Sequence, residues 1–248
     1  MEIIETSKGN ITVLYEDRHV ISFIKPFGIL SQKADNSNED SILELIEKAK
    51  DGVKLFPVHR LDRTTGGVMV AAKTKEAASA LSTLVTDGGM KKEYLAAVHG
   101  KSGSGILEDD LYFDKRKNKS FVVKKDSGRR GVKRAVLEYE TLDTVPHPSG
   151  EASLIRVRLM TGRTHQIRVQ MSNAGHPLLG DGKYGGRDNK CECALWSSRI
   201  GFDTDKLKSS RIGKSTFARE IEKSPELLTS TPAGYPWDMF GAISNTDK

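Results

Sequence analysis

Alternating hydrophobic and polar positions occur along most of the chain and predict more strands than helices. Residues 11–24 form short strands around a turn at Glu16-Asp17, and Ile155, Val157 and Leu159 alternate with two arginines in residues 153–160. Side chains with a period of two lie on opposite faces of a strand. Further strands are expected at residues 68–72, 93–99, 132–142 and 194–202.

Two segments have clear helical patterns. Residues 41–50 begin with Ser41 and Glu44, which have the spacing of a capping box. Residues 75–87 follow Thr74, which we expect to be the N-cap. The side chains expected to face inward from this second helix are Ala78, Leu81 and Val85.

A third helix is expected at residues 165–173, with Thr164 as its cap. The polar segment after Asp203 is followed by an aromatic segment, residues 232–240, which we expect to dock on the body of the protein. Because strands outnumber helices and do not alternate strictly with them, the chain is expected to have an α+β fold with a largely antiparallel sheet. No repeat or long linker interrupts it, so residues 1–248 are interpreted as a single domain with a core at about 11–240.

Composition indicates a nucleic-acid partner and argues against a metal site and a membrane partner. The 248 residues carry a net charge of +6, which favours an anionic partner such as nucleic acid. Two cysteines, Cys191 and Cys193, provide neither a disulfide framework nor a complete zinc site, so no metal is expected. The absence of a long apolar run or a signal-peptide pattern predicts a cytoplasmic protein with no membrane partner.

The segment from His59 to Gly67 is dense in reactive side chains and lies between two strand-like segments. Asp62 stands between Arg60 and Arg63, and positive neighbours favour the ionised carboxylate that a nucleophile or general base needs. The alternative interpretation is a surface turn in which a threonine side chain bonds the backbone.

A second polar segment runs from Thr161 to Arg168. A helix beginning after Thr164 would place His165 and Arg168 one turn apart, and its free N–H groups near Arg163 would suit a phosphate. An ordinary amphipathic helix with outward polar residues would explain the same pattern.

Residues 115–134 contain ten lysines and arginines against one acidic residue, Asp126. We expect a basic hairpin with its tip at Ser127-Gly128 that contacts phosphates; a solvated charged hairpin is the alternative. Its candidate RNA-binding residues are Lys115, Arg116, Lys119, Arg129 and Arg130. Tyr94, on the strand 93–99, is most simply a core residue, although a tyrosine can also stack on a base.

Five blocks in a fixed order add a more specific signal. They are Lys25-Pro26 with Gly28, His59 through Lys73, Lys92 through Gly100, Gly162 through Gly185, and Tyr235-Pro236-Trp237 with Phe240. Together they resemble the RNA pseudouridine synthases of the RluA family. The resemblance implies a long, mixed, mostly antiparallel sheet with flanking helices and a central active-site cleft, and isomerisation of uridine in tRNA or rRNA without cofactor or metal.

The resemblance also implies roles for individual residues. Asp62 would be the essential carboxylate, Tyr94 would stack on the target base, and Arg168 would pair with Asp62. Arg60 would reach into the RNA, with His59 and Arg163 as further RNA contacts, and Leu195 is the expected apolar wall of the pocket. Whether Asp62 attacks the ribose C1′ or removes a ribose proton stays open.

The sequence departs from the family pattern in places. Leu195-Trp196-Ser197 stands where Leu-His-Ala is frequent, and Thr64-Thr65-Gly66-Gly67 where Asp-Thr-Ser-Gly is usual. The catalytic segment begins near the N-terminus, so a preceding RNA-binding module is not expected, and the family suggests a monomer. A catalytically inactive RNA-binding protein and a nucleoside hydrolase are the competing hypotheses, although Asp62, Tyr94 and Arg168 are all present and a hydrolase would want a second carboxylate.

Overall fold

The computed structural model describes residues 2–33, 38–124, 128–186, 188, 190–224 and 227–244. The chain divides into two compact units. The first comprises Met1–Lys92 and Ser197–Ser230, and the second comprises Glu93–Trp196 and Thr231–Lys248. Two strands, β6 (Met90–His99) and β11 (Leu195–Phe202), contribute residues to both units.

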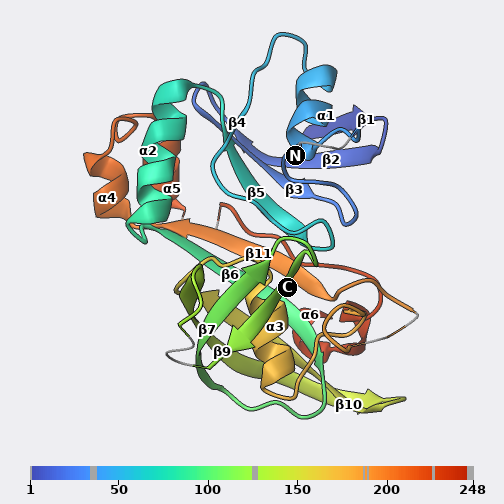
Figure 1. Cartoon of the computed structure of the whole chain (residues 1–248). Coiled ribbons are helices and arrows are strands. Elements are labelled where there is room, and N and C mark those ends of the chain that lie inside the picture. The colour runs from blue at the N-terminus through green and yellow to red at the C-terminus, as the bar shows by residue number, and fades with distance from the viewer. Residues whose placement is uncertain are drawn as a thin grey trace. The chain divides into compact units, whose positions relative to one another are not determined.

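The first unit is built on antiparallel strands (Figure 1). β3 pairs with β2 on one side and β5 on the other, and every side chain of β5 is buried, as its uninterrupted apolar sequence predicts. A short strand, β4, also pairs with β5. The strands are β1 (Glu2–Thr6), β2 (Gly9–Glu16), β3 (Val20–Lys25), β4 (Phe56–Pro57) and β5 (Gly66–Ala72).

The two helices predicted in this unit are confirmed. α1 (Ile42–Ala49) has the complete capping box of Ser41 and Glu44, and α2 (Lys75–Thr86) begins at the Thr74 cap. The buried side of α2 was predicted only in part, because Leu81 is fully buried whereas Ala78 and Val85 are partly buried. The fully buried stripe of α2 consists of Ala77, Ala80, Leu81 and Leu84.

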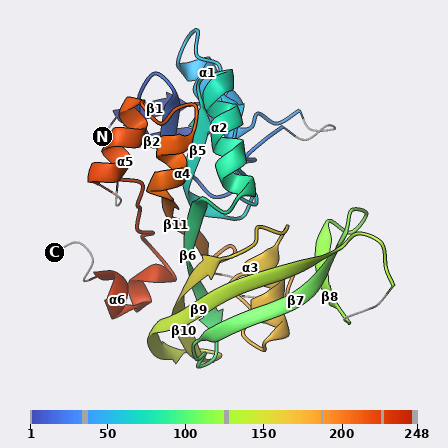
Figure 2. The same cartoon turned by 90° about the vertical axis from the view of Figure 1, so that its left-hand side faces the viewer.

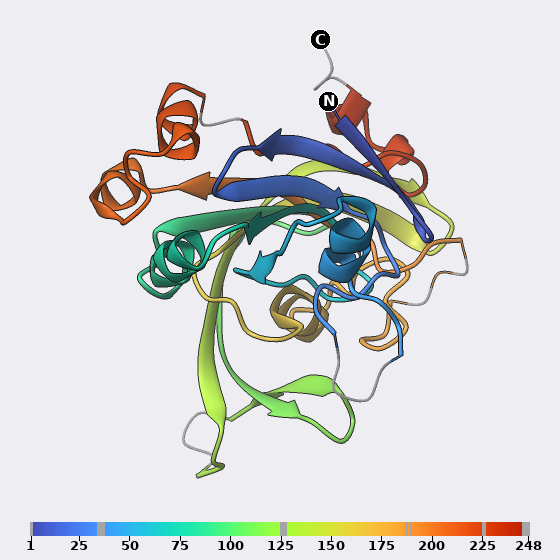
Figure 3. The same ribbon diagram turned by 90° about the horizontal axis from the view of Figure 1, so that it is seen from above.

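Two short helices in the polar segment after Asp203 were not predicted. α4 (Thr204–Ser209) is capped by Asp203 and α5 (Thr216–Lys223) by Ser215, and the two helices lie beside each other (Figure 3, orange). Phe217 and Ile221 of α5 are buried in the main apolar cluster of the unit. This burial stabilises helices that are too short to form alone.

The second unit holds a longer antiparallel sheet (Figure 2). β9 (Val132–His147) is its longest strand and pairs with β10 on one side and β7 on the other. β6 pairs with the free side of β10, and β8 with the free side of β7. The remaining strands are β7 (Gly105–Asp114), β8 (Lys119–Val123) and β10 (Gly150–Leu159).

The basic stretch is not one hairpin with a tip at residues 127 and 128. A tight turn at residues 115–118 joins β7 to β8, and Asn118 there has a φ of 45°. A second connection leads from β8 to β9, and it includes Gly128 with a φ of +64°. Ser127 of the predicted tip lies outside the described residues. The described cations of the basic stretch therefore lie on these two connections, on β8 and at the start of β9.

The start of α3 (Gln166–Asn173) corrects a second prediction. His165, not Thr164, is the N-cap, and it has the left-handed φ of 56° with no side-chain capping bond. The Gln166 side chain reaches back instead, and its Oε1 accepts hydrogen bonds from Thr161 Oγ1 and the Arg163 N–H, both at 2.9 Å. This glutamine fixes the loop that a threonine cap was expected to fix.

The aromatic segment near the C-terminus docks as predicted. Trp237 and Phe240 are both buried within the second unit. Trp237 is the first residue of a short 3₁₀ helix, η1 (Trp237–Met239), and Phe240 directly precedes α6 (Gly241–Ser244). The apolar surface of these two side chains accounts for the docking.

Candidate active-site elements and RNA-binding groove

The loop that carries Asp62 lies in the first unit, directly before β5. The Thr65 N–H donates to the Asp62 carbonyl oxygen at 3.0 Å, which closes a turn around the carboxylate-bearing residue. Arg60 and Arg63 are exposed and Asp62 is half-buried. The loop therefore presents a carboxylate between two cations, as the sequence predicted.

A buried lysine, Lys25, binds the backbone of this loop through hydrogen bonds. Lys25 is fully buried, and its ammonium donates to the carbonyl oxygens of Pro26 and Thr65, both at 2.8 Å. It also donates to the Arg63 carbonyl at 3.4 Å. A buried ammonium is tolerated where such charge-assisted bonds replace water. Lys25 thus holds the backbone on the C-terminal side of Asp62.

The early turn of the chain holds the other side of the loop. Ser31 Oγ donates to the Leu61 carbonyl at 2.7 Å and accepts from the Leu61 N–H at 3.0 Å. The Gly28 N–H donates to the Arg63 carbonyl, and Arg63 Nε returns a bond to the Gly28 carbonyl, both at 2.9 Å. Bonds to the residues on both sides of Asp62 preorganise its backbone.

Gly67 allows the loop to enter β5 against β11. Its φ is +111°, and a Cβ at this position would lie 2.3 Å from the carbonyl oxygen of Ser197. Ser197 Oγ in turn donates to the Val68 carbonyl at 3.0 Å. No residue with a side chain fits here without moving the backbone.

His59 has a structural role that differs from the predicted RNA contact. It is 7% exposed, and its Nε2 accepts a hydrogen bond from the Val70 N–H at 3.0 Å. Desolvation, with a smaller contribution from the positive charge of Lys92, lowers the pKa of His59 to about 3. The imidazole is therefore neutral and supports β5 from within the unit, and we do not include it among the RNA contacts.

Tyr94 and Leu195 lie in the second unit and are both buried. Tyr94 stands on β6 opposite Val157 of β10, and Leu195 is the first residue of β11. Trp196 is also buried. These side chains could form the apolar part of a base-binding pocket, which is what the sequence predicted for Tyr94 and Leu195.

Arg168 forms a buried ion pair that sequence reasoning missed. Its Nε and Nη2 donate to the two carboxylate oxygens of Asp181 at 2.6 and 2.7 Å. The Cys193 thiol lies 3.7 Å from the same carboxylate. Such a two-point contact fixes the guanidinium plane. The predicted pairing of Arg168 with Asp62 joins residues of different units and stays a prediction.

His165 and Tyr184 are linked beside this ion pair. The Tyr184 hydroxyl accepts from the Ser120 N–H at 2.8 Å and lies 2.9 Å from His165 Nδ1. The tautomer of His165 determines which of the two groups donates in this hydrogen bond. The network joins β8 to the start of α3.

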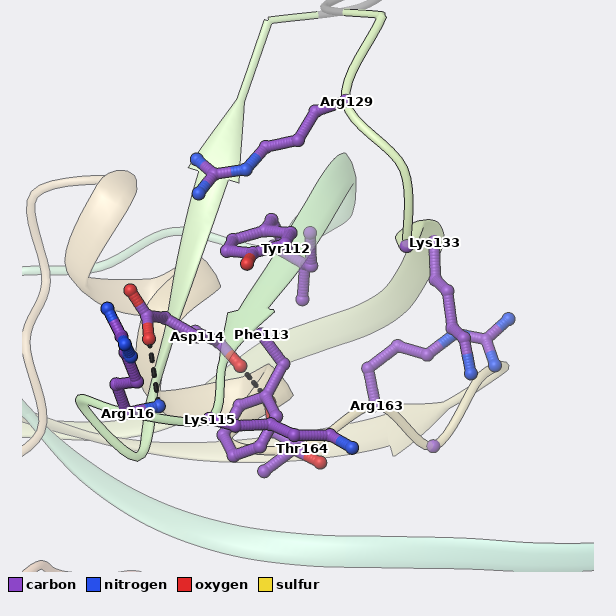
Figure 4. Close-up of a pocket in the computed structure, with 13 residues that line it drawn as sticks. Tyr112, Phe113, Asp114, Lys115, Arg116, Arg129, Lys133, Arg163 and Thr164 are labelled. Atoms are coloured by element: carbon purple, nitrogen blue, oxygen red, sulfur yellow. Dashed lines mark hydrogen bonds between the residues drawn. The ribbon is translucent and has the colours of Figure 1, made fainter.

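A groove of about 720 Å³ opens on the second unit next to this network (Figure 4). Five of its lining residues are cations and one, Asp114, is an anion. The cations are Lys115, Arg116, Arg129, Lys133 and Arg163. Four of these five belong to the predicted RNA-binding set, and Lys133 was missed as a member.

Two residues of the basic stretch that were predicted to bind RNA lie outside the lining of this groove. Arg130 is exposed but is not a lining residue. Lys119 donates from its ammonium to the Lys183 carbonyl and lies 4.9 Å from the centre of the Tyr184 ring. Lys119 therefore braces the turn against the loop at residues 181–186.

Residues 19–173 match the profile of a family described as RNA pseudouridylate synthase. The chain belongs to this family. The predicted RluA resemblance is confirmed, and with it an enzyme that isomerises uridine to pseudouridine in RNA.

Among the described residues, no group of three or more histidine, cysteine or acidic side chains could hold a metal ion, and no helix could span a membrane.

Named relatives extend the match over most of this pseudouridine synthase. It is 32% identical over 244 residues to "Ribosomal large subunit pseudouridine synthase D" of Borreliella burgdorferi, covering 91% of this chain and 69% of the relative. It is 32% identical to the protein of the same name from Zymomonas mobilis, covering 82% and 64%. It is 33% identical to "Dual-specificity RNA pseudouridine synthase RluA" of Escherichia coli, covering 70% of this chain and 77% of the relative.

Solved structures support the fold. The structure titled "Human RNA Pseudouridylate Synthase Domain Containing 1" superposes on this chain with a TM-score of 0.66. The two are 22% identical, and the superposition covers 78% of each chain. The structure titled "Human RNA Pseudouridylate Synthase Domain Containing 4" superposes with a TM-score of 0.60 at 21% identity. This superposition covers 77% of this chain and 84% of the human chain. The predicted α+β pseudouridine synthase fold is thereby confirmed.

Proposed function

We propose that this pseudouridine synthase converts uridines of tRNA or ribosomal RNA to pseudouridine, with Asp62 as the catalytic carboxylate. The observation that carries this proposal is the position of Asp62 in the family motif, on a loop whose backbone Lys25, Ser31 and Gly28 hold. Catalytic groups gain most from such preorganisation, because misplacement by about 1 Å can cost on the order of a hundredfold in rate.

The reaction needs no redox or energy input, since product and substrate are isomers. The C1′–N1 bond breaks, the base turns over, and a C1′–C5 bond forms. The proton on C5 leaves to solvent and N1 gains a proton, so the atoms balance. Asp62 serves as an anion in either route: it attacks C1′, or it takes a ribose proton while the base departs.

Tyr94 and Leu195 are proposed to enclose the detached base while it turns. Both are buried side chains with apolar surface, and a dry enclosure would keep the base from escaping. Arg168 is proposed to pair with Asp62 and to stabilise its ionised form. The fork with Asp181 supports this role because it fixes the orientation of the guanidinium.

RNA is proposed to bind Arg60 of the first unit and exposed cations around the groove of the second unit. Arg60 is exposed beside Asp62 and is suited to enter the gap left when the target uridine leaves its stack. Exposed cations of the basic stretch, with Arg163, are suited to phosphates. tRNA or ribosomal RNA is proposed as the substrate class because three relatives carry ribosomal or dual-specificity names.

Several expectations from the sequence remain proposals. They are a single catalytic domain at 1–248, a monomeric state, a cytoplasmic location, and turnover without cofactor or metal. The last is tested by assaying activity in the presence of a chelator, which should leave the rate unchanged.

The proposal is tested by mapping pseudouridine in tRNA and ribosomal RNA. Carbodiimide labelling followed by reverse transcription marks pseudouridines, and RNA from cells with and without the gene is compared. One or more marks should vanish with the gene and return with the wild-type copy, but not with Asp62→Asn. Marks that Asp62→Asn restores in full would exclude Asp62 as the catalytic carboxylate.

A further inference from the structure

The groove on the second unit is more than a cluster of charges, because an aromatic platform stands inside it. The Arg129 guanidinium carbon lies 3.6 Å from the centre of the Tyr112 ring. Figure 4 shows Arg129 extended over that ring, and both side chains line the groove. The distance is that of a stacked pair, so the flat guanidinium forms a second layer above the tyrosine.

Cations from separate elements surround this platform. Lys133 comes from the start of β9, Arg163 from the loop before α3, and Lys115 and Arg116 from the turn after β7. Arg163 is partly fixed, because its Nε donates to the Arg134 carbonyl at 2.9 Å. The groove therefore offers positive charge on several sides of one flat surface.

The one acidic residue that lines the groove, Asp114, bonds the backbone of the adjacent turn. Asp114 Oδ1 accepts backbone hydrogen bonds from Arg116 at 2.9 Å and Lys117 at 3.2 Å, so it caps the turn between β7 and β8. This arrangement holds the Lys115 and Arg116 backbone in place. The net charge of the lining is positive, which is complementary to phosphate.

From this geometry we propose that the groove is a nucleotide subsite that holds an unstacked nucleotide of the substrate RNA, separate from the uridine being modified. The base stacks on the Tyr112–Arg129 platform, and its neighbouring phosphates contact Lys133, Arg163 and Lys115. A volume of about 720 Å³ is ample for a single nucleotide. The subsite rests on the proposed function, because it assigns the occupant as substrate RNA.

The proposal explains why an arginine stands at position 129. Bases in single strands stack on aromatic rings and on guanidinium planes, whereas a lysine offers only a point charge. Duplex RNA keeps its bases stacked internally, so it could use the cations of the groove but not the platform. The subsite should therefore favour single-stranded or flipped-out nucleotides.

The test uses the full chain with Arg129→Lys, which keeps the charge and removes the plane, and Arg211→Lys as its matched control. Arg211 is an exposed arginine of the first unit that neither lines the groove nor belongs to the predicted RNA-binding residues. Fluorescence anisotropy measures the Kd of a short labelled oligouridylate and of a blunt RNA duplex across a salt series. Arg129→Lys should weaken oligouridylate binding about fivefold or more, with unchanged salt slope and unchanged duplex affinity, while Arg211→Lys should match the wild type.

Tyr112→Ala should have a larger effect, about 5- to 150-fold on oligouridylate affinity, as expected for loss of a stacked base. Phe121→Ala is its control, because Phe121 lies on β8 of the same hairpin but outside the groove lining. Unchanged oligouridylate affinity in both Arg129→Lys and Tyr112→Ala would overturn the subsite, as would a loss that is equal for duplex and single strand.

Catalysis is scored separately, so the two proposals can fail independently. If wild-type protein modifies RNA but the platform variants bind oligouridylate normally, the subsite is wrong and the enzyme assignment stands. If the platform variants lose oligouridylate affinity as described but no uridine is modified by the wild type, the subsite binds RNA and the proposed function is wrong.

Discussion

The buried ammonium of Lys25 donates a hydrogen bond to the carbonyl oxygen of Thr65 at 2.8 Å, three residues beyond Asp62. With its bonds to Pro26 and Arg63, it links the early turn of the chain to the loop that carries the carboxylate. The three N–H donors of the ammonium match the three carbonyl groups that it contacts.

Lys25→Met should therefore affect both stability and rate. It leaves the carbonyl groups of Pro26, Arg63 and Thr65 without their charged donor, so we expect the free energy of unfolding to fall by roughly 2–4 kcal/mol. The loop should loosen, and kcat should fall about tenfold or more with little change in RNA affinity. Denaturant unfolding and single-turnover kinetics measure these effects.

Lys33→Met is the matched control, since Lys33 is exposed and forms a surface pair with Glu44 at 3.2 Å. It should change the free energy of unfolding by less than about 1 kcal/mol. Equal effects of the two substitutions would show that Lys25 does not fasten the loop.

Asp181→Asn should separate orientation of Arg168 from RNA binding. It replaces a buried carboxylate that Arg168 contacts at 2.6 and 2.7 Å, so we expect a loss of about 3 kcal/mol in stability. Because the guanidinium loses its fixed plane, kcat should fall strongly while the Kd for RNA stays near the wild-type value.

Glu222→Gln is the control for Asp181→Asn. Glu222 pairs with Lys208 at the surface, where both side chains are about half exposed. Glu222→Gln should therefore leave the free energy of unfolding and kcat nearly unchanged. A wild-type kcat in Asp181→Asn would refute the positioning role of Asp181.

His59 should make stability depend on pH. Its folded pKa is lowered to about 3 from an ordinary value of 6.5, so between these values the unfolded chain binds a proton that the folded protein excludes. The free energy of unfolding should therefore fall as pH drops below 6.5. In His59→Gln, whose amide oxygen can still accept from Val70, this fall should be shallower.

Chemical denaturation from pH 8 down to pH 4 tests this linkage. The stability advantage of the wild type over His59→Gln should be largest at the alkaline end and shrink on acidification. A difference that stays constant over this range would mean that His59 does not titrate between the folded and unfolded states.

Lys133→Ala and Arg163→Ala test the charges of the groove. Each removes a phosphate contact, so the salt dependence of binding to a single-stranded RNA should decrease by about 0.7 in its log–log slope. Lys48→Ala, which removes a cation paired with Asp40 at 2.6 Å in the first unit, should leave the slope unchanged. An unaltered slope in both groove variants would remove these residues from the RNA interface.

Sequence patterns predicted those features that depend on neighbours in the chain. The capping box of Ser41 and Glu44, the Thr74 cap and the buried strand β5 all follow from local spacing. The cap of α3 was wrong because the Gln166 side chain, whose Nε2 also bonds the Val136 carbonyl, holds the loop through a tertiary contact. α4 and α5 were missed because their polar sequences conceal short helices that packing stabilises.

The candidate site was predicted in its residues more than in its contacts. Asp62, Tyr94 and Arg168 could be selected from motifs, but the partner Asp181 lies thirteen residues from Arg168 and is brought to it only by folding. His59 was misjudged because a histidine beside a catalytic motif gives no sign of its burial. The Tyr112–Arg129 stack joins β7 to the connection before β9, which no local pattern reveals.

The most direct test of the central claim is tritium release from RNA labelled at C5 of uridine, because forming the C1′–C5 bond expels the C5 hydrogen. Unmodified transfer and ribosomal RNA, prepared from cells that lack this enzyme, is incubated with wild-type protein, Asp62→Asn and a no-enzyme control. We predict release by the wild type alone, with Asp62→Asn retaining RNA affinity. Release by Asp62→Asn at the wild-type rate would contradict the account, as would no release by a wild-type protein that binds the RNA.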